Sequence, residues 1–275
     1  MEKKQAKWGK IPARIYFTIA FLILILFVML FANHLAKHDP TEIDLLNKFA
    51  ESSREYPFGT DDYGRCIFCR CLLAVRNSVG IAVSIELVSV IMGIALGMTA
   101  AYRGGVIDYV INMVSEALLS FPSVILIMLI VAFLGASTKN IILAMLMVNW
   151  IWYTRISRSL TLTIKERKYV QAARLCGASS VNILIRHIFP GILSQMVAQF
   201  TMSLGSVILS LAGFSFLGIG IQRPTPELGV MISDGCAMIR TNFMVLFWPS
   251  ITLFLIVLAF NILGDWVSEG LRGRD

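Results

Sequence analysis

The chain has 275 residues, of which 57% are hydrophobic, and its mean hydropathy is +0.75. Soluble domains have about 45–50% apolar residues, so this composition argues against a soluble domain and predicts helices that span a membrane. In a membrane protein, the net charge of +7 indicates basic cytoplasmic loops and contact with lipid headgroups, not binding of nucleic acid.

The amino-terminal end predicts a cytoplasmic start followed by a retained anchor. Residues 1–14 carry five basic side chains against one acid, Glu2, and residues 15–36 carry no formal charge. This apolar run is long for a signal peptide and no small-x-small cleavage site follows it, so we expect a first spanning helix. The polar residues 37–76, of mixed charge, are expected on the outer side of the membrane.

Three more spans are predicted at residues 77–102, at about 109–134 and from about residue 140 onward. A tight cytoplasmic turn at Arg103 ends the second span, and Pro122 predicts a kink in the third. The fourth span passes Trp150 and Trp152, which could form an interface belt or line a translocation path.

Between the fourth and fifth spans lies a polar, basic segment, residues 169–190. Its first half has the pattern of a helix ended by Gly177, a residue that tolerates the left-handed conformation. Its second half has one apolar stripe at helical spacing and is limited by Pro190. The stripe consists of Val181, Leu184, Ile185 and Ile188. Small residues in the first half allow another backbone to approach, which predicts a surface element held by a partner.

A fifth helix is predicted from residue 191 to about 212, followed by an outer segment with a short re-entrant or interfacial helix. A sixth span covers about 244–264. Fifteen of the 24 Lys and Arg residues fall in the segments placed inside, which favours six spans with both termini in the cytoplasm.

Several motifs give the chain a resemblance to the permeases of ATP-binding-cassette (ABC) importers. Ala172, Ala173, Gly177 and Pro190 keep the spacing of the coupling loop of that family, whereas Gln171 stands where the family usually has Glu. The segment Gly59-Thr60-Asp61-Asp62-Tyr63-Gly64-Arg65 is similar to the one that precedes the second helix in peptide and nickel importer permeases. That family continues with Asp and Ser where this chain has Cys66 and Cys69. Residues 215–220 and 259–265 also resemble family stretches.

The resemblance implies an all-α, polytopic membrane protein with six transmembrane helices and a cytoplasmic coupling helix, the type I importer permease fold. Charge and hydropathy divide the chain into a cytoplasmic end and first span, residues 1–36, an extracytoplasmic segment, residues 37–76, and a remainder, residues 77–275. The resemblance, which runs from about residue 57 to residue 265, implies that this remainder is the core permease domain with five transmembrane helices and coupling loop 161–190. The implied ATPase-coupling residues are Gln171, Ala172, Ala173, Gly177, Ala178 and Pro190.

The resemblance also implies partners and a location. The partners would be a second permease subunit in a heterodimer, two ATPase subunits that bind the ATP, an extracytoplasmic solute-binding protein and membrane lipid, with no nucleic acid. The location would be the inner membrane of a bacterial or archaeal cell. The cargo would be nickel or a small metal chelate, or else dipeptides and oligopeptides. Residues 149–155 look closer to the nickel branch of the family, which favours nickel.

The chain lacks the motifs of several enzyme classes. It has no Gly-x-x-x-x-Gly-Lys-Ser/Thr phosphate loop, no His-Glu-x-x-His and no Gly-x-Ser-x-Gly. We therefore expect no enzyme activity and no cofactor in this chain. A stand-alone secondary transporter or channel is the alternative function, and it would need its own site for a coupling ion.

Two sets of residues carry open hypotheses. Glu86 is the acid deep in a predicted span, where a charge is costly. It could face the translocation path, pair with another side chain in a structural role, or lie at an interface. His34, His38, Cys66, Cys69 and Cys71 could together ligate a soft or borderline metal. The alternative is that these histidines lie at an interface and the cysteines act as small apolar residues. We expect no metal site, and the five cysteines of the chain do not make a disulfide framework.

Overall fold

The computed structural model describes residues 13–272, and within this range every regular element is a helix, apart from one isolated β-bridge between Thr60 and Cys66. The predicted all-α class is confirmed. The long helices are α1 (Ala13–Leu35), α2 (Ile67–Arg103), α5 (Thr138–Lys165), α8 (Phe189–Phe216) and α10 (Met244–Arg272). The short ones are η1 (Leu45–Asn47), α3 (Gly105–Leu119), α4 (Ser123–Leu134), α6 (Lys168–Leu175), α7 (Ser180–Asn182), η2 (Ile183–Ile188) and α9 (Leu228–Ala237).

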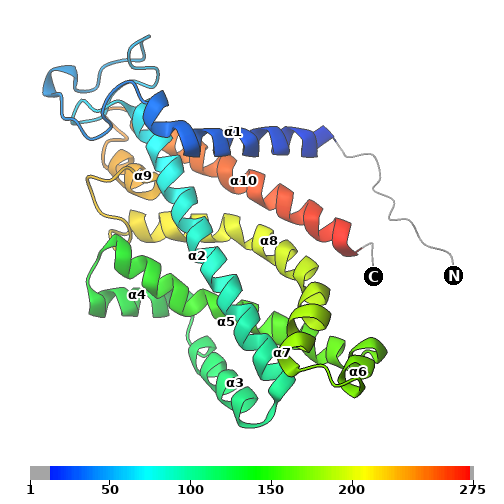
Figure 1. The fold of residues 1–275 in the computed structure, drawn as a ribbon. Helices are drawn as coiled ribbons and strands as arrows, with labels where there is room; N and C mark the ends of the chain where they lie inside the picture. Colours follow the sequence, from blue (N-terminus) through cyan, green and yellow to red (C-terminus); the bar gives the residue numbers. More distant parts are fainter. Residues whose placement is uncertain (1–12, 273–275) are drawn as a thin grey trace.

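Helix α2 is the centre of the bundle (Figure 1). It packs along α5 and also contacts α1, α8 and α10, while α10 packs on α8 and α9. The core between these helices is built from branched and aromatic apolar side chains such as Ile85, Ile141 and Ile208, all fully buried.

Four helices of the described residues are long and apolar enough to cross a membrane: Ile15–Leu35, Ile67–Arg103, Ser180–Phe216 and Met244–Gly270. The bent pair of α3 and α4 makes a fifth span if it is counted as one. Helix α5 has 28 residues, long enough for the predicted fourth span, but its polar residues keep it out of that group. In chain order α1, α2, the bent pair, α5, α8 and α10 correspond to the six predicted spans.

The third predicted span is not one kinked helix. Helices α3 and α4 meet at 89°, and the break lies just before Pro122 (Figure 1). Proline has no N–H to donate and keeps the residue before it out of the helical region, so the first helix has to end there. A new helix then starts at Ser123 with Pro122 at its N-cap.

The second span begins ten residues earlier than predicted, at Ile67 instead of residue 77. The sequence pattern was misleading here because Arg70 looks like a loop residue. Its guanidinium is buried instead, 3.6 Å from the Asp61 carboxylate, and it donates a hydrogen bond of 3.1 Å to the carbonyl of Pro40. The other end was predicted correctly: α2 ends at Arg103, and Gly104 and Gly105 both have positive φ.

Pro190 does not limit the helix that precedes it. Residues 180–216 form one continuous helical run, in which Ile183–Ile188 is π-helical and Pro190 lies in the first turn of α8. The wider π turn re-spaces the backbone hydrogen bonds around a residue that cannot donate one. The predicted apolar stripe is therefore split: Ile188 is buried, whereas Val181 and Ile185 are exposed.

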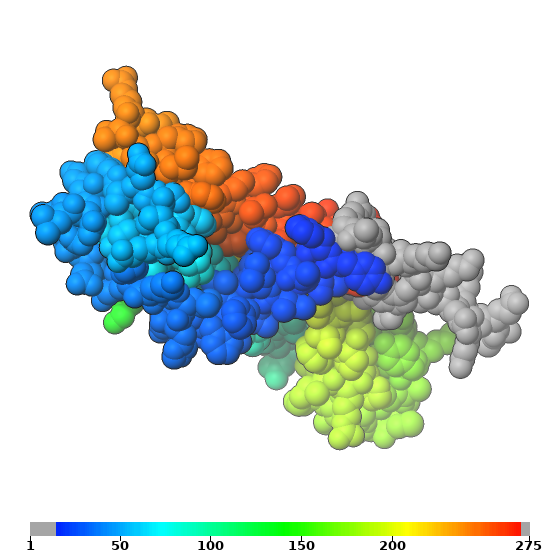
Figure 2. All heavy atoms as spheres, turned by 90° about the horizontal axis from the view of Figure 1, so that it is seen from above, coloured from blue at the N-terminus to red at the C-terminus, as the bar shows by residue number. Residues whose placement is uncertain are grey.

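The molecule has two distinct ends. Residues 37–66 and α9 lie together at one end, and α6, α7 and η2 lie at the other (Figures 1 and 2). The predicted outer segment and the predicted coupling element therefore lie at opposite ends of the molecule.

Candidate functional site

The first candidate site is the coupling element, residues 168–190. Helix α6 is anchored by Val170, and η2 by Ile183 and Ile188; all three are buried in a second apolar cluster with Tyr153 of α5. Tyr169 of α6 donates a hydrogen bond of 3.3 Å to the carbonyl of His187. The element is thus a packed part of the fold.

Gly177 ends α6 in the predicted way. Its φ is +78°, its N–H donates to the carbonyl of Arg174, and the N–H of Ala178 donates to the carbonyl of Ala173 at 3.1 Å. A β-carbon at Gly177 would have no atom of this chain within 4 Å. The glycine is needed for its backbone conformation, and the space beside it is open to a partner.

The free surface of this element is apolar at several points. Leu175 is 89% exposed, and Val181, Ile185 and Cys176 are exposed as well. Of the predicted coupling residues, four are exposed and two are half-buried. The exposed ones are Gln171, Ala172, Gly177 and Pro190, and the half-buried ones are Ala173 and Ala178. Exposed apolar side chains on a rigid, mostly basic element are typical of a protein interaction site.

Side chains connect the coupling element to the spanning helices. The Arg174 guanidinium lies 5.5 Å from the ring centre of Tyr102 at the end of α2. Lys165 donates to the carbonyl of Ala101 at 3.0 Å, and Arg158 of α5 holds Asp108 of α3 through two hydrogen bonds of 2.6 and 2.7 Å. Arg174 thus links α6 to α2, whereas Lys165 and Arg158 link α5 to α2 and to α3.

The second candidate site is a buried polar network around Glu86 of α2. Glu86 is 1% exposed and accepts a hydrogen bond from the hydroxyl of Tyr153 on α5. The same hydroxyl lies 2.6 Å from Ser203 Oγ on α8, and Ser203 also interacts with the Glu86 carboxyl. Neither Tyr153 nor Ser203 was predicted as a partner of Glu86, since nothing in the sequence pairs residues so far apart.

The other two residues assigned to a translocation path lie away from this network. Trp152 is exposed, and Trp150 is half-buried and donates to the carbonyl of Met147 at 2.9 Å. The network is held together because α2 and α5 approach closely at Gly93, where a β-carbon would lie 2.9 Å from the backbone nitrogen of Thr154. The hydroxyl of Ser157 donates to the Gly93 carbonyl across the same contact at 2.9 Å.

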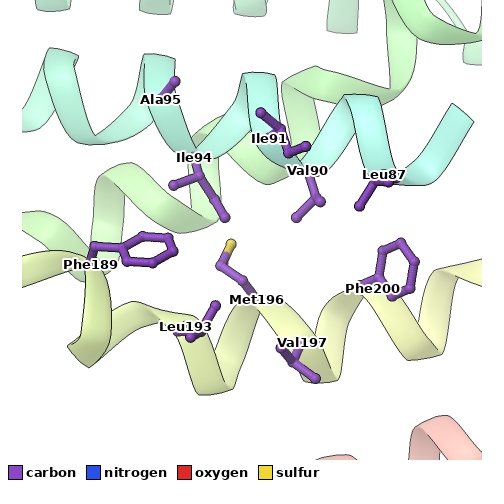
Figure 3. A pocket seen from close by; sticks show the side chains of 10 residues that line it. All are labelled: Leu87, Val90, Ile91, Ile94, Ala95, Phe189, Leu193, Met196, Val197 and Phe200. Atoms are coloured by element: carbon purple, nitrogen blue, oxygen red, sulfur yellow. The ribbon is translucent and has the colours of Figure 1, made fainter. Parts of the chain in front are cut away.

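An apolar groove of about 430 Å³ lies between α2 and α8 (Figure 3). One of its lining residues is Leu87, which follows Glu86 in the chain. Leu87, Val90 and Ile94 line one wall, and Met196 and Phe200 line the other. Its walls offer no polar group for a hydrophilic cargo, so the groove does not by itself form a translocation path.

The candidate metal ligands are brought together only in part. Cys66 and Cys69 contact each other, and the sulfur of Cys69 lies against the backbone N–H groups of Lys37 and His38. The His38 ring stacks on Tyr56 instead, with ring centres 4.8 Å apart, and His34 is exposed. Among residues 13–272, no group of three or more His, Cys, Asp or Glu side chains is arranged to hold a metal ion.

The structure is a helical bundle with apolar spans and an element with exposed apolar side chains at one end. The chain belongs to the family described as "Binding-protein-dependent transport system inner membrane component", which matches residues 93–274. It is a permease subunit of an ABC importer, as its motifs suggested, and the alternative of a stand-alone transporter or channel is not supported.

Three relatives cover nearly the whole chain. The chain is 34% identical to the nickel transport system permease protein NikC of Escherichia coli K12, over 92% of this chain and 91% of that protein. It is 34% identical to the dipeptide transport system permease protein DppC of Alkalihalophilus pseudofirmus, over 98% of this chain and 87% of that protein. It is 37% identical to the glutathione transport system permease protein GsiD of Escherichia coli O6:K15:H31, over 91% of this chain and 83% of that protein.

Among solved structures, a chain of the MetNI methionine ABC transporter, in inward-facing conformations, is similar at a TM-score of 0.49. It is 18% identical, and the match covers 72% of this chain and 96% of that one.

Proposed function

We propose that this chain pairs with a related permease chain to form the translocation path of an importer driven by two separate ATPase subunits. An extracytoplasmic binding protein delivers the cargo, and both termini lie in the cytoplasm. The observation that carries the proposal is the exposed apolar surface on residues 168–190, anchored from below by Val170 and Ile188. In isolation such a surface would be costly to leave in water.

The coupling step follows from the connections of that surface. An ATPase subunit bound to this surface would carry α6 with it on closing. The bundle would follow because Val170 fixes α6 to it. Lys165 and Arg174 then pass the displacement to the cytoplasmic end of α2. In this proposal, Gln171, Ala172, Ala173, Gly177, Ala178 and Pro190 lie in the interface with the ATPase.

For the cargo we propose nickel or a small nickel chelate, with short peptides as the second candidate. The three relatives are named for nickel, a dipeptide and glutathione, a tripeptide, so the shared fold serves both kinds of cargo. A path that bound a metal tightly would trap it, and no cluster of ligands is found in the described residues. Selectivity would then rest mainly with the binding protein.

The substrate is tested by uptake in cells that lack their own nickel and peptide importers. The complete system is expressed, and radioactive nickel, a labelled dipeptide and labelled glutathione are supplied in parallel. We expect nickel uptake that is lost when the ATPase genes are omitted. Peptide uptake without nickel uptake would overturn the proposed cargo and leave the permease function intact.

The orientation is tested with single cysteines in a variant whose exposed Cys176 and Cys236 are replaced by serine. A cysteine in place of the exposed Glu51 should react with a membrane-impermeant maleimide in intact cells. A cysteine in place of the exposed Ser180 should react only after permeabilisation. The reverse pattern would contradict the proposed orientation.

A further inference from the structure

The start of α2 that is predicted to lie outside carries two cysteines to which the proposed function assigns no role. Cys66 is the N-cap residue of α2, and Cys69 lies in its first turn. The backbone N–H of Cys69 points at the Cys66 sulfur, with 3.4 Å between the two atoms. The two side chains therefore lie on one face at the tip of the helix.

The N-cap position of Cys66 allows a covalent bond that regular helical spacing would not. Residues three apart inside a helix have β-carbons about 5–6 Å apart, whereas a disulfide needs β-carbons roughly 3.5–4.5 Å apart. The extended backbone of Cys66, with φ −63° and ψ 113°, leaves its side chain free to turn over the helix end. Cys71 is two residues beyond Cys69, so it points to another side of the helix and is buried among apolar side chains of the core.

We propose that Cys66 and Cys69 form a reversible disulfide, and that its oxidant is a disulfide carried by an extracytoplasmic exchange protein or a small molecule. The proposal rests on the orientation given above, because it places this end of α2 in the compartment where disulfides persist.

The reaction is a thiol–disulfide exchange that starts at Cys69. Its sulfur faces the N–H groups of Lys37 and His38, whereas the contact with Cys69 and burial raise the pKa of the Cys66 thiol. The Cys69 thiolate attacks one sulfur of the donor disulfide, which breaks that bond, forms a mixed disulfide and releases one donor thiolate. The Cys66 sulfur gives up its proton and attacks the Cys69 sulfur of the mixed disulfide, which forms the Cys66–Cys69 bond, breaks the bond to the donor and releases the second donor sulfur. Two protein thiols become one disulfide, and the donor receives two electrons and both protons as two thiols.

Access to the pair is controlled by the segment that covers it. Cys66 is 1% exposed and Cys69 is 2% exposed. The cover at residues 37–40 is fastened by the hydrogen bond from Arg70 to the Pro40 carbonyl. The donor can reach Cys69 when this cover lifts or before it closes during folding, so we expect slow exchange in the folded protein.

The bond would secure a junction that holds the outer segment to the bundle. Cys66 bridges to Thr60, and the N–H of Ile67 donates to the carbonyl of Gly59 at 3.1 Å. A link between the N-cap and the first turn of α2 keeps both contacts in register with the helix.

The test counts reactive thiols in the full chain. Cells are quenched in acid, the protein is denatured, and free thiols are tagged with a maleimide polymer before and after reduction. The chain has five cysteines, so we expect three tags without reductant and five with it. Cys66→Ser and Cys69→Ser should each show four tags under both conditions, and the control Cys71→Ser should show two and then four.

Five tags without reductant, both from aerobic cells and from membranes incubated with oxidised glutathione, would overturn the proposal. Two tags in the unreduced Cys66→Ser variant would overturn it too, because another pair would then be linked. The readout on the unaltered chain does not depend on how the variants fold. It is also independent of uptake, and the membranes treated with oxidised glutathione test the pair whichever way the chain is inserted, so failure of the proposed function would be seen separately.

Discussion

The hydroxyl of Tyr153 on α5 donates a hydrogen bond to the buried carboxyl of Glu86 on α2, and the two residues are 67 positions apart in the chain. Ser203 of α8 completes the group, with 2.6 Å between its hydroxyl oxygen and that of Tyr153. A polar group in the apolar interior is stable only with partners. The three residues therefore fix how α2, α5 and α8 sit relative to one another.

Removal of the tyrosine hydroxyl should weaken the bundle. Tyr153→Phe keeps the ring and leaves the Glu86 carboxyl with fewer partners, so we expect a stability loss of about 1–3 kcal/mol. The measurement is thermal unfolding of the purified permease in nanodiscs. Tyr109→Phe on the exposed face of α3 is the matched control and should unfold like the unaltered chain. Equal melting of both variants would contradict this prediction and would mean that Ser203 is sufficient as a partner of Glu86.

Glu86→Gln, which keeps the shape of the side chain, distinguishes a structural role of Glu86 from a role in the translocation path. Glu86→Gln retains an oxygen that can accept the hydrogen bond from Tyr153, and Glu86 is enclosed by the bundle. We therefore expect normal assembly and near-normal uptake. Reduced uptake with unchanged melting temperature and basal ATPase activity would show that Glu86 acts in the translocation path.

The docking surface is tested at Gly177. Gly177→Asp places a charged side chain beside the exposed Leu175, so we expect normal insertion, loss of transport and weaker co-purification of the ATPase subunits. Gly218 is the matched control, since it ends α8 with φ +79°, the same backbone strain for any side chain, and open space around its β-carbon position. Gly218 lies at the opposite end of the molecule, and Gly218→Asp should keep the ATPases bound. Equal retention in both variants would refute docking at Gly177.

The cysteines should matter little for transport. Replacing Cys66, Cys69 and Cys71 together by serine removes the proposed disulfide, which closes a very short loop and so constrains little of the unfolded chain. We expect uptake of at least about half the normal level, because a weak effect on stability leaves most molecules folded. Nickel uptake is measured at matched expression. Its loss in the serine variant would show that these thiols contact the cargo.

The sequence predicted the features that depend on short stretches of chain. The uncharged runs of α1 and α10 are recognised by composition, and the positive φ of Gly177 follows from its position after a helical pattern. The coupling residues were found through their spacing, and the structure places four of the six on the surface. Their role in docking stays a prediction.

The features that failed depend on contacts between distant residues. Arg70 made the start of α2 look like a loop, because its burial depends on Asp61 and Pro40 in the folded outer segment. Pro190 looked like a helix end, since a π turn that accommodates proline has no pattern in sequence. The partners of Glu86 depend on how closely α2 and α5 approach at Gly93, which is known only from the fold.

The central claim is that this chain transports only as part of an ATP-driven complex. The most direct measurement compares proteoliposomes that contain this chain alone with proteoliposomes that contain both permeases and both ATPases, with loaded binding protein and labelled nickel outside and ATP inside. We predict accumulation in the complete system, dependent on ATP, and none with this chain alone. ATP-independent transport by the chain alone would contradict the account.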